Sequence, residues 1–308
     1  MLQKAPQRLL VTGLTGFVGS HLKHFLEREG GKRWVLSPTP AFDLTQKDSI
    51  KKALGDQAPE AVIHLAGQSF VPEAFRDPAG TLNTNMIGTL NLLQSLKDIG
   101  FSGNFLYVSS GDVYGQVPEA QLPISETQAA NPRNPYSVSK LAAETLCRQW
   151  SFVEPWRITV ARPFNHIGPG QNESFIVPSV ARQLQRIRKG LQAPRIQVGD
   201  VDITRDFIDV QDVVNAYLQL LENGQNGETY NVCSGREQSV RELINDLIRL
   251  SGVQAEITTD PTRFRPAEQR RVCGNYAKLH AATGWKPGVD LRDTLKHVLD
   301  DWAQRPMS

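Results

Sequence analysis

The feature that most restricts the fold is a glycine-rich turn close to the start of the chain. An apolar run, Arg8–Thr12, leads directly into Gly13, Gly16 and Gly19, and a helical pattern follows. Glycines let the backbone approach a diphosphate, and the helix offers free N–H groups and the positive end of its dipole. An ordinary glycine-rich turn is the alternative. Because strand, turn and helix follow one another directly, we predict a dinucleotide-binding unit.

Strand and helix patterns alternate through the first half of the chain. Expected strands cover Arg8–Thr12, Arg33–Ser37, Ala61–Ala66, Asn104–Ser109 and Arg157–Arg162, with helices at Lys47–Leu54, around Thr81–Ile99 and around Tyr136. This alternation predicts an α/β fold with a Rossmann-type doubly wound parallel sheet, in which ligands bind beyond the carboxyl ends of the strands. The turns that follow four of these strands would then converge on one crevice.

The second half is less regular and predicts a smaller lobe that closes over the substrate. Residues 1–162 plus about 203–231 form the expected dinucleotide-binding domain, and about 163–202 plus 232–308 form the expected substrate lobe. The segment that begins at Arg205 is expected to return a strand and a helix to the main sheet. Trp285 and Trp302 are expected in the core of the small lobe.

A Tyr and a Lys four residues apart, Tyr136 and Lys140, indicate the chemistry. Residues at this spacing lie on one face of a helix, so we expect the ammonium group to lower the pKa of the phenol and improve it as an acid–base catalyst. Ser109 or Ser110, after an expected strand, can supply a second donor to a carbonyl oxygen. With the glycine turn, these residues predict a nicotinamide-dependent enzyme that transfers a hydride at a carbonyl or carbinol carbon.

Composition argues against several other classes of function. The 308 residues include 34 basic and 32 acidic side chains, and the net charge of +2 favours neither nucleic acid nor a membrane surface as partner. The three cysteines and six histidines show no metal-ligand spacing, so we expect no metal, no disulfide framework and a reducing, cytoplasmic location. We also expect no secretion signal and no membrane span. The partner should be a small molecule.

Several motifs resemble those of one enzyme family. They are Thr12-Gly-x-x-Gly-Phe-x-Gly19, His64-Leu-Ala-Gly67, Ser109-Ser-Gly-Asp-Val-Tyr-Gly115, Tyr136-x-x-x-Lys140 and Arg162-Pro-Phe-Asn165. They extend over nearly the whole chain and are similar to those of the extended short-chain dehydrogenase/reductases that act on nucleotide sugars. Within that family, the chain most resembles the GDP-mannose 4,6-dehydratases and related reductases, through Gln68-Ser-Phe-Val, Gly235-Arg-Glu-Gln-Ser239, Arg263-Phe-Arg265-Pro-Ala-Glu268 and Gly284-Trp-Lys-Pro287.

The resemblance implies a role for each matching residue. It implies a cofactor site made of Gly13, Thr15, Gly16, Phe17, Val18, Gly19, Ser37, Asp43, Leu44, Leu65, Ala66, Gly67, Tyr136 and Lys140. It implies substrate contacts from Ser69, Ser110, Asn165, Val177, Arg182, Arg205, Arg265 and Glu268. Arg205 would pair with the diphosphate through charge-assisted hydrogen bonds, and Arg265 with Glu268 would lie at the nucleoside end. A surface ion pair with Asp206 or Asp209 is the alternative for Arg205.

One departure from the dehydratase pattern bears on the reaction. The dehydratases that the chain resembles have a Glu where this chain has Asp112, and that Glu handles the C-5 proton of the sugar. An Asp is one methylene shorter, and a displacement of about 1 Å can cost about 10²-fold in rate. We therefore expect a reductase that converts GDP-4-keto-6-deoxy-D-mannose to GDP-D-rhamnose, with Ser110, Tyr136, Lys140 and Asp112 as its catalytic residues. The alternatives are a dehydratase, a 4-epimerase, a talose-type product and a non-catalytic NAD(P)-sensing regulator.

The segment after the second expected strand bears on cofactor choice and assembly. Leu36-Ser37-Pro-Thr39 places no carboxylate before Asp43, which leaves room for a 2′-phosphate, although no Arg is placed to clamp it. NADPH is therefore favoured, and NADH is expected to work. The segment is also shorter than the arginine-containing one of the tetrameric dehydratases that the chain resembles. We therefore expect a homodimer built from the helix near Thr81–Ile99 and the Tyr136 helix.

Overall fold

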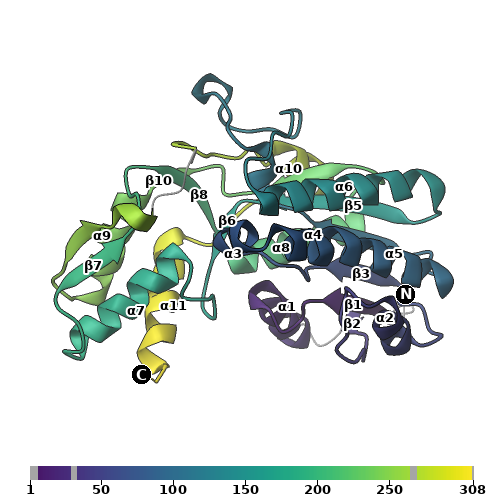
Figure 1. Ribbon diagram of the computed structural model, residues 1–308, viewed down its shortest axis with the longest axis horizontal. Helices are drawn as coiled ribbons and strands as arrows, with labels where there is room; N and C mark the ends of the chain where they lie inside the picture. Colours follow the sequence, from purple (N-terminus) through teal and green to yellow (C-terminus); the bar gives the residue numbers. More distant parts are fainter. Residues whose placement is uncertain (1–5, 29–32, 264–268, 307–308) are drawn as a thin grey trace.

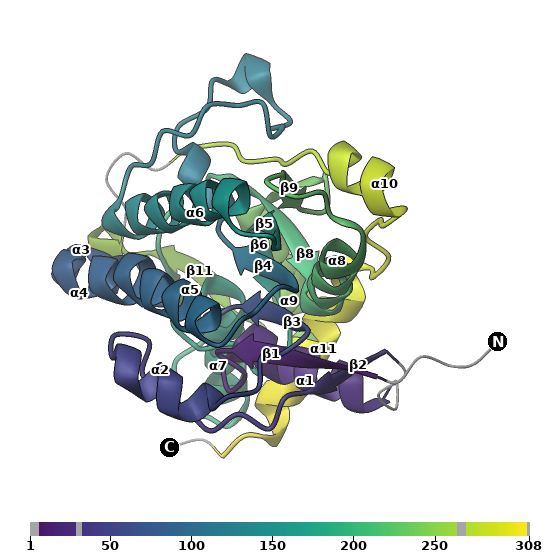
Figure 2. The same cartoon turned by 90° about the vertical axis from the view of Figure 1, so that its right-hand side faces the viewer.

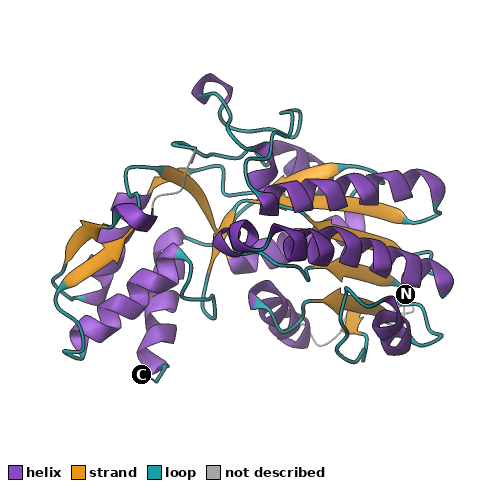
Figure 3. Ribbon diagram, in the orientation of Figure 1, coloured by secondary structure: helices purple, strands orange, loops and turns teal. Residues whose placement is uncertain are grey.

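The computed structural model describes residues 6–28, 33–263 and 269–306, which form a large lobe and a smaller lobe side by side (Figure 1, Figure 3). The strands of the large lobe are short, apolar and mostly buried, as expected of a sheet covered on both faces. They are β1 (Gln7–Thr12), β2 (Trp34–Leu36), β3 (Ala61–His64), β4 (Asn104–Val108), β5 (Arg157–Pro163) and β9 (Thr229–Val232).

These strands form one parallel sheet in the order β2-β1-β3-β4-β5-β9. Helices α2 (Lys47–Leu54), α5 (Gly88–Asp98) and α6 (Pro135–Val153) cover one face, and α1 (Phe17–Arg28) and α8 (Val210–Asn223) cover the other (Figure 2). The chain therefore reverses its direction across the sheet between β1 and β3, where such folds bind ligands. The α/β fold class predicted from the alternating pattern is confirmed.

The long helix expected around Thr81–Ile99 is divided into pieces. Pro78 begins a new helix after α3 (Val71–Arg76), and α4 (Pro78–Leu82) continues through a π-helical turn, η1 (Asn83–Ile87), into α5. A π turn accommodates one extra residue and often marks a functional position. Here it contains Asn85, which is buried beside α6.

Among the described residues, the smaller lobe contains two small sheets and three helices that share a second apolar core. One sheet has the order β10-β8-β6 and the other pairs β11 with β7. Their strands are β6 (Asn165–Ile167), β7 (Arg195–Val198), β8 (Thr204–Asp209), β10 (Glu237–Ser239) and β11 (Glu256–Thr259), and the helices are α7 (Ile176–Arg188), α9 (Val240–Ser251) and α11 (Leu291–Gln304).

Two expectations about the second half are wrong. The strand at Arg205, β8, does not return to the main sheet; β9 takes that place, while α8 does pack on the main sheet as expected. Asp206, within β8, explains why β8 lies outside the main sheet. Its buried carboxylate accepts hydrogen bonds from the backbone N–H groups of Ser234, Gly235 and Gly274, whereas a strand of the main sheet would need an apolar side chain there. Trp285 packs in the large-lobe core, whereas Trp302 lies in the small-lobe core as expected.

Candidate active site

The glycine turn after β1 has a shape that only glycine allows. Gly13 has a φ of +73°, and a Cβ there would lie 2.9 Å from the backbone nitrogen of Ala66, at the end of β3. A Cβ on Gly19 would lie 2.2 Å from the carbonyl oxygen of Gly13. Helix α1 begins at Phe17 with no acidic residue in its first turn. Open N–H groups, close backbone approach and the absence of a competing carboxylate in this turn suit a cofactor diphosphate.

The segment after β2 suits a phosphorylated ribose better than a bare one. The hydroxyl of Thr39 donates to the Ser37 hydroxyl at 3.1 Å, and residues 33–42 contain no acidic side chain. Asp43 is engaged by its own loop, since it accepts hydrogen bonds from the N–H and the hydroxyl of Thr45, each at 2.8 Å. These bonds hold the pKa of Asp43 below its usual value. Leu44 is buried in the core beneath it, so only part of this segment is available to a ligand.

Helix α6 presents Tyr136 and Lys140 in its first two turns. Asn134 caps the helix by accepting a hydrogen bond from the N–H of Ser137 at 2.8 Å, the Ser137 hydroxyl returns the contact, and Pro135 occupies the first helical position. Tyr136 hydrogen-bonds with the hydroxyl of Ser110, which follows β4. The structure therefore selects Ser110 as the partner of the phenol. Ser109 is buried, and its hydroxyl has no hydrogen-bond partner among the residues that the structure describes.

The electrostatics of this pair differ from the sequence-based expectation. Burial raises the pKa of the partly exposed Tyr136 phenol to about 12, and the hydrogen bond with Ser110 opposes that rise. Lys140 does not lower the pKa of Tyr136, because its ammonium group donates to the carbonyl oxygen of Val108 at 2.8 Å and lies over the Tyr107 ring, 5.2 Å from its centroid. Burial lowers the pKa of Lys140 to about 8. Tyr136 is thus in its protonated form near neutral pH.

Asp112 is held beside the start of helix α6, which carries Tyr136 and Lys140. Its carboxylate accepts a hydrogen bond from the side-chain amide of Asn134 at 2.7 Å, and its N–H donates to the Ser110 hydroxyl at 3.1 Å. This contact connects η2 (Gly111–Tyr114) to the residue that caps α6. Asp112 therefore has a structural partner beside the site, which agrees with a role in orienting neighbouring groups.

A buried polar chain beneath the site was not found from the sequence. The Thr12 hydroxyl lies 2.6 Å from Nδ1 of His64, and Nε2 of His64 lies 3.0 Å from the Thr89 hydroxyl, which donates to the carbonyl oxygen of Asn85. Thr12 also accepts from the N–H of Ala66, so the pattern assigns the ring proton to Nε2. Burial and the charge of Lys140 lower the pKa of His64 to about 3, so this imidazole stays neutral.

The Asn85 side chain extends this series of buried hydrogen bonds to α6. Its carbonyl oxygen accepts from the N–H of Gln68 at 2.8 Å, and its amide donates to the Ser139 hydroxyl at 2.8 Å. Gly67 is packed against this amide, and a Cβ on it would lie 2.7 Å from the Asn85 oxygen and 3.7 Å from Nζ of Lys140. Gly67, one of the expected cofactor residues after β3, therefore lies beside Lys140. The two hydroxyls and the Asn look ordinary in the sequence because their partners lie on other elements.

The expected substrate residues are distributed over both lobes. Ser69 and Asn165 are exposed, and Arg182 pairs with Glu173 at 3.1 Å. Val177 is fully buried in the small-lobe core, and this burial argues against the substrate contact expected of it. Arg265 and Glu268 lie outside the described residues. Across the lobes, the rings of Phe70 and Phe175 meet edge to face, with 6.2 Å between their centroids.

Comparison with known proteins places this arrangement in a family. A family model described as GDP-mannose 4,6 dehydratase matches residues 39–298. A GDP-6-deoxy-D-mannose reductase from Pseudomonas aeruginosa is 59% identical, over 97% of this chain and 98% of that protein. This chain belongs to the GDP-mannose 4,6-dehydratase family. The resemblance seen in the sequence motifs is thereby confirmed.

Two further family relatives bear on reaction and cofactor. A GDP-6-deoxy-D-talose 4-dehydrogenase from Aggregatibacter actinomycetemcomitans is 33% identical, over 88% of this chain and 90% of that protein. A solved structure described as RMD from Pseudomonas aeruginosa complexed with NADPH matches with a TM-score of 0.92 at 57% identity, covering 97% of this chain and 100% of that one. The glycine turn and the segment after β2 thus occur in a fold that is known with this cofactor.

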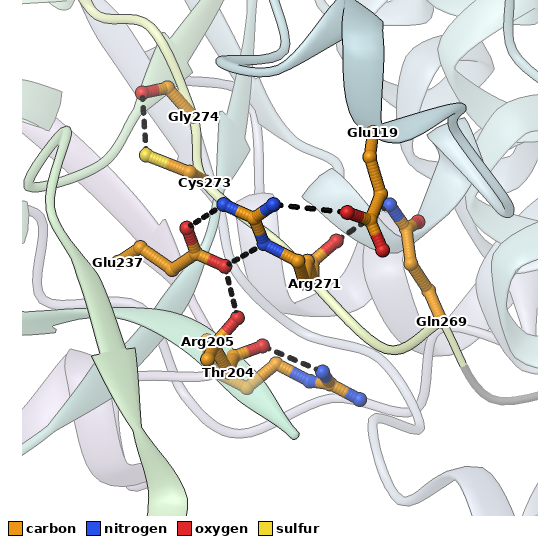
Figure 4. A network of polar contacts seen from close by, with 8 residues as sticks. All are labelled: Glu119, Thr204, Arg205, Glu237, Gln269, Arg271, Cys273 and Gly274. Carbon is orange, nitrogen blue, oxygen red and sulfur yellow. Dashed lines mark hydrogen bonds and ion pairs between the residues drawn. The ribbon is translucent and has the colours of Figure 1, made fainter. Parts of the chain in front are cut away.

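Arg271 lies at the centre of a polar network between the lobes (Figure 4). The sequence did not predict this network. Its guanidinium donates to both carboxylate oxygens of Glu237 at 2.7 Å and to Glu119 at 2.9 Å. Thr204 donates to the same Glu237 carboxylate, and Arg205 donates to the carbonyl oxygen of Thr204 at 2.7 Å. These ion pairs raise the pKa of Arg271 and lower that of Glu237. The network fixes β8 beside the loop that contains Glu119.

No group of three or more His, Cys, Asp or Glu side chains among residues 6–28, 33–263 and 269–306 is arranged to hold a metal ion. No helix in the same residues has the length and apolar character needed to cross a membrane.

Proposed function

We propose that this chain uses NADPH to reduce the C-4 keto group of GDP-4-keto-6-deoxy-D-mannose and forms GDP-D-rhamnose. The observation that carries the proposal is the Ser110–Tyr136 hydrogen bond at the carboxyl end of the parallel sheet, in a chain 59% identical to a GDP-6-deoxy-D-mannose reductase. Two donors that point at one oxygen are what a carbonyl undergoing reduction requires. The enzyme would act in the synthesis of a deoxysugar precursor for polysaccharides.

Each catalytic side chain has a separate task in this reduction. Bound NADPH supplies the hydride, which adds to C-4 of the sugar. Tyr136, protonated because burial raises its pKa to about 12, gives its proton to the developing alkoxide. Ser110 donates a hydrogen bond to the same oxygen and thereby stabilises its charge. Lys140 would hold the nicotinamide ribose of the bound cofactor and would keep Tyr136 in place from the next turn of α6.

The structure favours reduction over the dehydratase alternative at one residue. A dehydratase needs a base that reaches C-5 of the sugar, and Asp112 is engaged by the Asn134 amide at 2.7 Å. A shorter carboxylate tied to a helix cap is poorly suited to remove a proton from carbon. We propose that Asp112 orients the sugar and that no elimination takes place.

The small lobe supplies the groups that recognise the nucleotide. Arg205 on β8 is the proposed partner of the diphosphate, with Asn165 and Ser69 as polar contacts nearer the sugar. Arg182 and the segment with Arg265 and Glu268 complete the proposed GDP site. A guanidinium suits a diphosphate because it offers paired charge-assisted hydrogen bonds.

Incubation of the purified protein with GDP-4-keto-6-deoxymannose and NADPH tests the proposal. We expect NADPH absorbance to fall in proportion to product, with NADH giving a slower reaction. NMR of the sugar should show the rhamno configuration at C-4. A talo configuration would assign the chain to the specificity of its 33% identical relative, and unchanged absorbance would contradict reductase activity.

We propose a homodimer that pairs through the helices beside the catalytic pair. Phe75, Ile87 and Val138, on α3, η1 and α6, are 54%, 37% and 42% exposed, and α6 packs against both α3 and η1. An apolar surface shared by adjacent helices suits an isologous two-fold contact. Light scattering should give twice the chain mass, and Val138→Asp should shift it to a monomer. A tetramer in the parent protein would contradict the proposal.

We also propose that the enzyme works in the cytoplasm. Its cysteines are free thiols, and Cys147 and Cys233 are buried. Free thiols are typical of proteins in a reducing compartment.

A further inference from the structure

The catalytic helix makes a second polar contact that is almost completely buried. Glu144 lies on the same face of α6 as Tyr136 and Lys140, because successive members are four residues apart. Its carboxylate accepts two hydrogen bonds from Arg162, at 2.5 Å from Nη2 and 3.1 Å from Nε. The two side chains are 1% and 7% exposed. A two-point contact at this depth fixes both groups, because neither charge can be left without its partner.

The same guanidinium group reaches the segment of residues 110–115, here called the serine loop. Cζ of Arg162 lies 4.7 Å from the centroid of the Tyr114 ring, a cation–π contact. Tyr114 is the last residue of η2, and Ser110 is the N-cap of that short helix. The Tyr114 hydroxyl donates to the side chain of Asn231, in β9, at 2.7 Å. One cation on β5 therefore contacts both the catalytic helix and the serine loop.

The rest of the serine loop is tightly seated. A Cβ on Gly111 would lie 3.1 Å from the ring of Phe164. Gly115 has a φ of +62°, and a Cβ there would lie 1.8 Å from the carbonyl oxygen of Asn131. Both ends of η2 thus rest on fixed neighbours, and the contact of Tyr114 with Arg162 adds a further point that holds the short helix.

We propose that Arg162 is a positioning residue for the reduction. By holding Glu144 and Tyr114 at one separation, it sets the distance between the serine hydroxyl and the catalytic phenol. The proposal rests on the proposed function, in which Ser110 and Tyr136 donate to the same oxygen. Arg162 is buried, and in this proposal it acts through the placement of Ser110 and Tyr136.

The first test removes both buried charges together, so that neither remains alone in the core. For the double variant Glu144→Leu/Arg162→Met we expect kcat to fall roughly 10- to 100-fold, as misplacement by about 1 Å allows, with KM and NADPH affinity nearly unchanged. Arg157→Met is the matched control. Arg157 lies at the other end of β5 and donates to the carbonyl oxygens of Leu221 and Glu222, at 2.7 and 2.8 Å. Its loss should lower stability and leave kcat unchanged.

The deciding measurement repeats the double variant in a Ser110→Ala background. If Arg162 acts by placing the Ser110 hydroxyl, its removal adds less than about threefold once that hydroxyl is gone, because coupled residues are not additive. A merely structural role would lower kcat by the same factor in both backgrounds, and that result would overturn the proposal. So would an unchanged kcat in the double variant.

A milder variant keeps the test decisive if the double variant does not fold. Tyr114→Phe leaves the ring against Arg162 and removes the hydroxyl, which hydrogen-bonds with both Asn231 and Arg162. We expect a kcat loss of roughly three- to tenfold that disappears in the Ser110→Ala background. Additive losses would again overturn the proposal. Failure of the proposed function would look different, because the parent protein itself would then not consume NADPH with GDP-4-keto-6-deoxymannose.

Discussion

The two lobes hold their functional charges in opposite ways. In the large lobe, Tyr136 is partly buried and Lys140 is buried, and burial moves both pKa values away from their usual ranges. In the small lobe, Arg182 and Arg271 are partly exposed and are held by carboxylates at the surface. Perturbed groups suit bond making, whereas exposed cations suit the recognition of a charged ligand. From this comparison we propose that the large lobe carries out the chemistry and that the small lobe recognises the nucleotide.

The largest effect should come from the phenol of the large lobe. For Tyr136→Phe we expect kcat to fall by about 10³- to 10⁴-fold, because the alkoxide loses its proton donor, while NADPH binding is nearly unchanged. Steady-state kinetics and fluorescence titration of NADPH measure both. Tyr217→Phe is a matched control, since Tyr217 is buried in the large lobe and its hydroxyl has no hydrogen-bond partner. A similar loss of kcat in both variants would break the comparison.

The second effect concerns the buried ammonium of Lys140 and its pH dependence. Its pKa is about 8 in the folded protein against 10.5 when unperturbed, so the unfolded chain binds this proton more tightly. Below about pH 8, Lys140 is charged in both states and lowers the unfolding free energy by its full amount. This penalty is relieved as the pH rises toward 10.5. The unfolding free energy of the parent, relative to Lys140→Met, should rise by about 3 kcal/mol across that window. Urea unfolding at several pH values measures it; a flat difference would show that Lys140 is not perturbed.

A smaller effect is expected at the diphosphate partner in the small lobe. Arg205→Met should raise KM for the nucleotide sugar by about 10- to 100-fold and change kcat little, because it removes charge-assisted bonds that are present both before and during reaction. Arg249→Met on α9, where Arg249 pairs with Asp246 at 2.9 Å, is the control and should leave KM unchanged. A fall in kcat equal to that in kcat/KM would place Arg205 in the chemistry and remove the distinction between the lobes.

The smallest effect is expected at the surface network of Arg271. For Arg271→Gln we expect KM to rise by less than about fivefold, since exposed ion pairs contribute little. The rise should shrink in high salt, because the contacts with Glu119 and Glu237 are screened in the parent as well. Kinetics at low and high ionic strength measure it. A large, salt-independent loss of kcat would indicate that this network acts on the catalytic residues.

Local patterns predicted the large lobe well. The apolar runs of β1, β3, β4 and β5 and the glycine turn are each short-range signals, and the capped helix with Tyr136 and Lys140 is another. The partner of β8 was not predictable in this way, because sheet order depends on contacts between distant segments. The contacts of Asn85 in its π turn and of Glu144 with Arg162 were not predicted, for the same reason. Each contact joins residues on separate elements.

The site was predicted in identity more than in energetics. The sequence indicated that Tyr136, Lys140 and Ser110 would meet, and the structure brings Ser110 to the phenol. It did not indicate that the Lys140 ammonium would bind the carbonyl oxygen of Val108, because a backbone acceptor has no signature in a sequence. Val177 was expected to contact the substrate but is buried. The prediction was wrong because helix periodicity alone does not show which side of α7 faces the core.

The most direct test of the central claim follows the hydride itself. NADPH that carries deuterium at C-4 of its nicotinamide ring is incubated with the enzyme and GDP-4-keto-6-deoxymannose, and the product is examined by NMR and mass spectrometry. We predict one deuterium at C-4 of a GDP-6-deoxyhexose, with one NADPH consumed per product. Deuterium at any other carbon of the sugar, or a product without deuterium, would contradict the account.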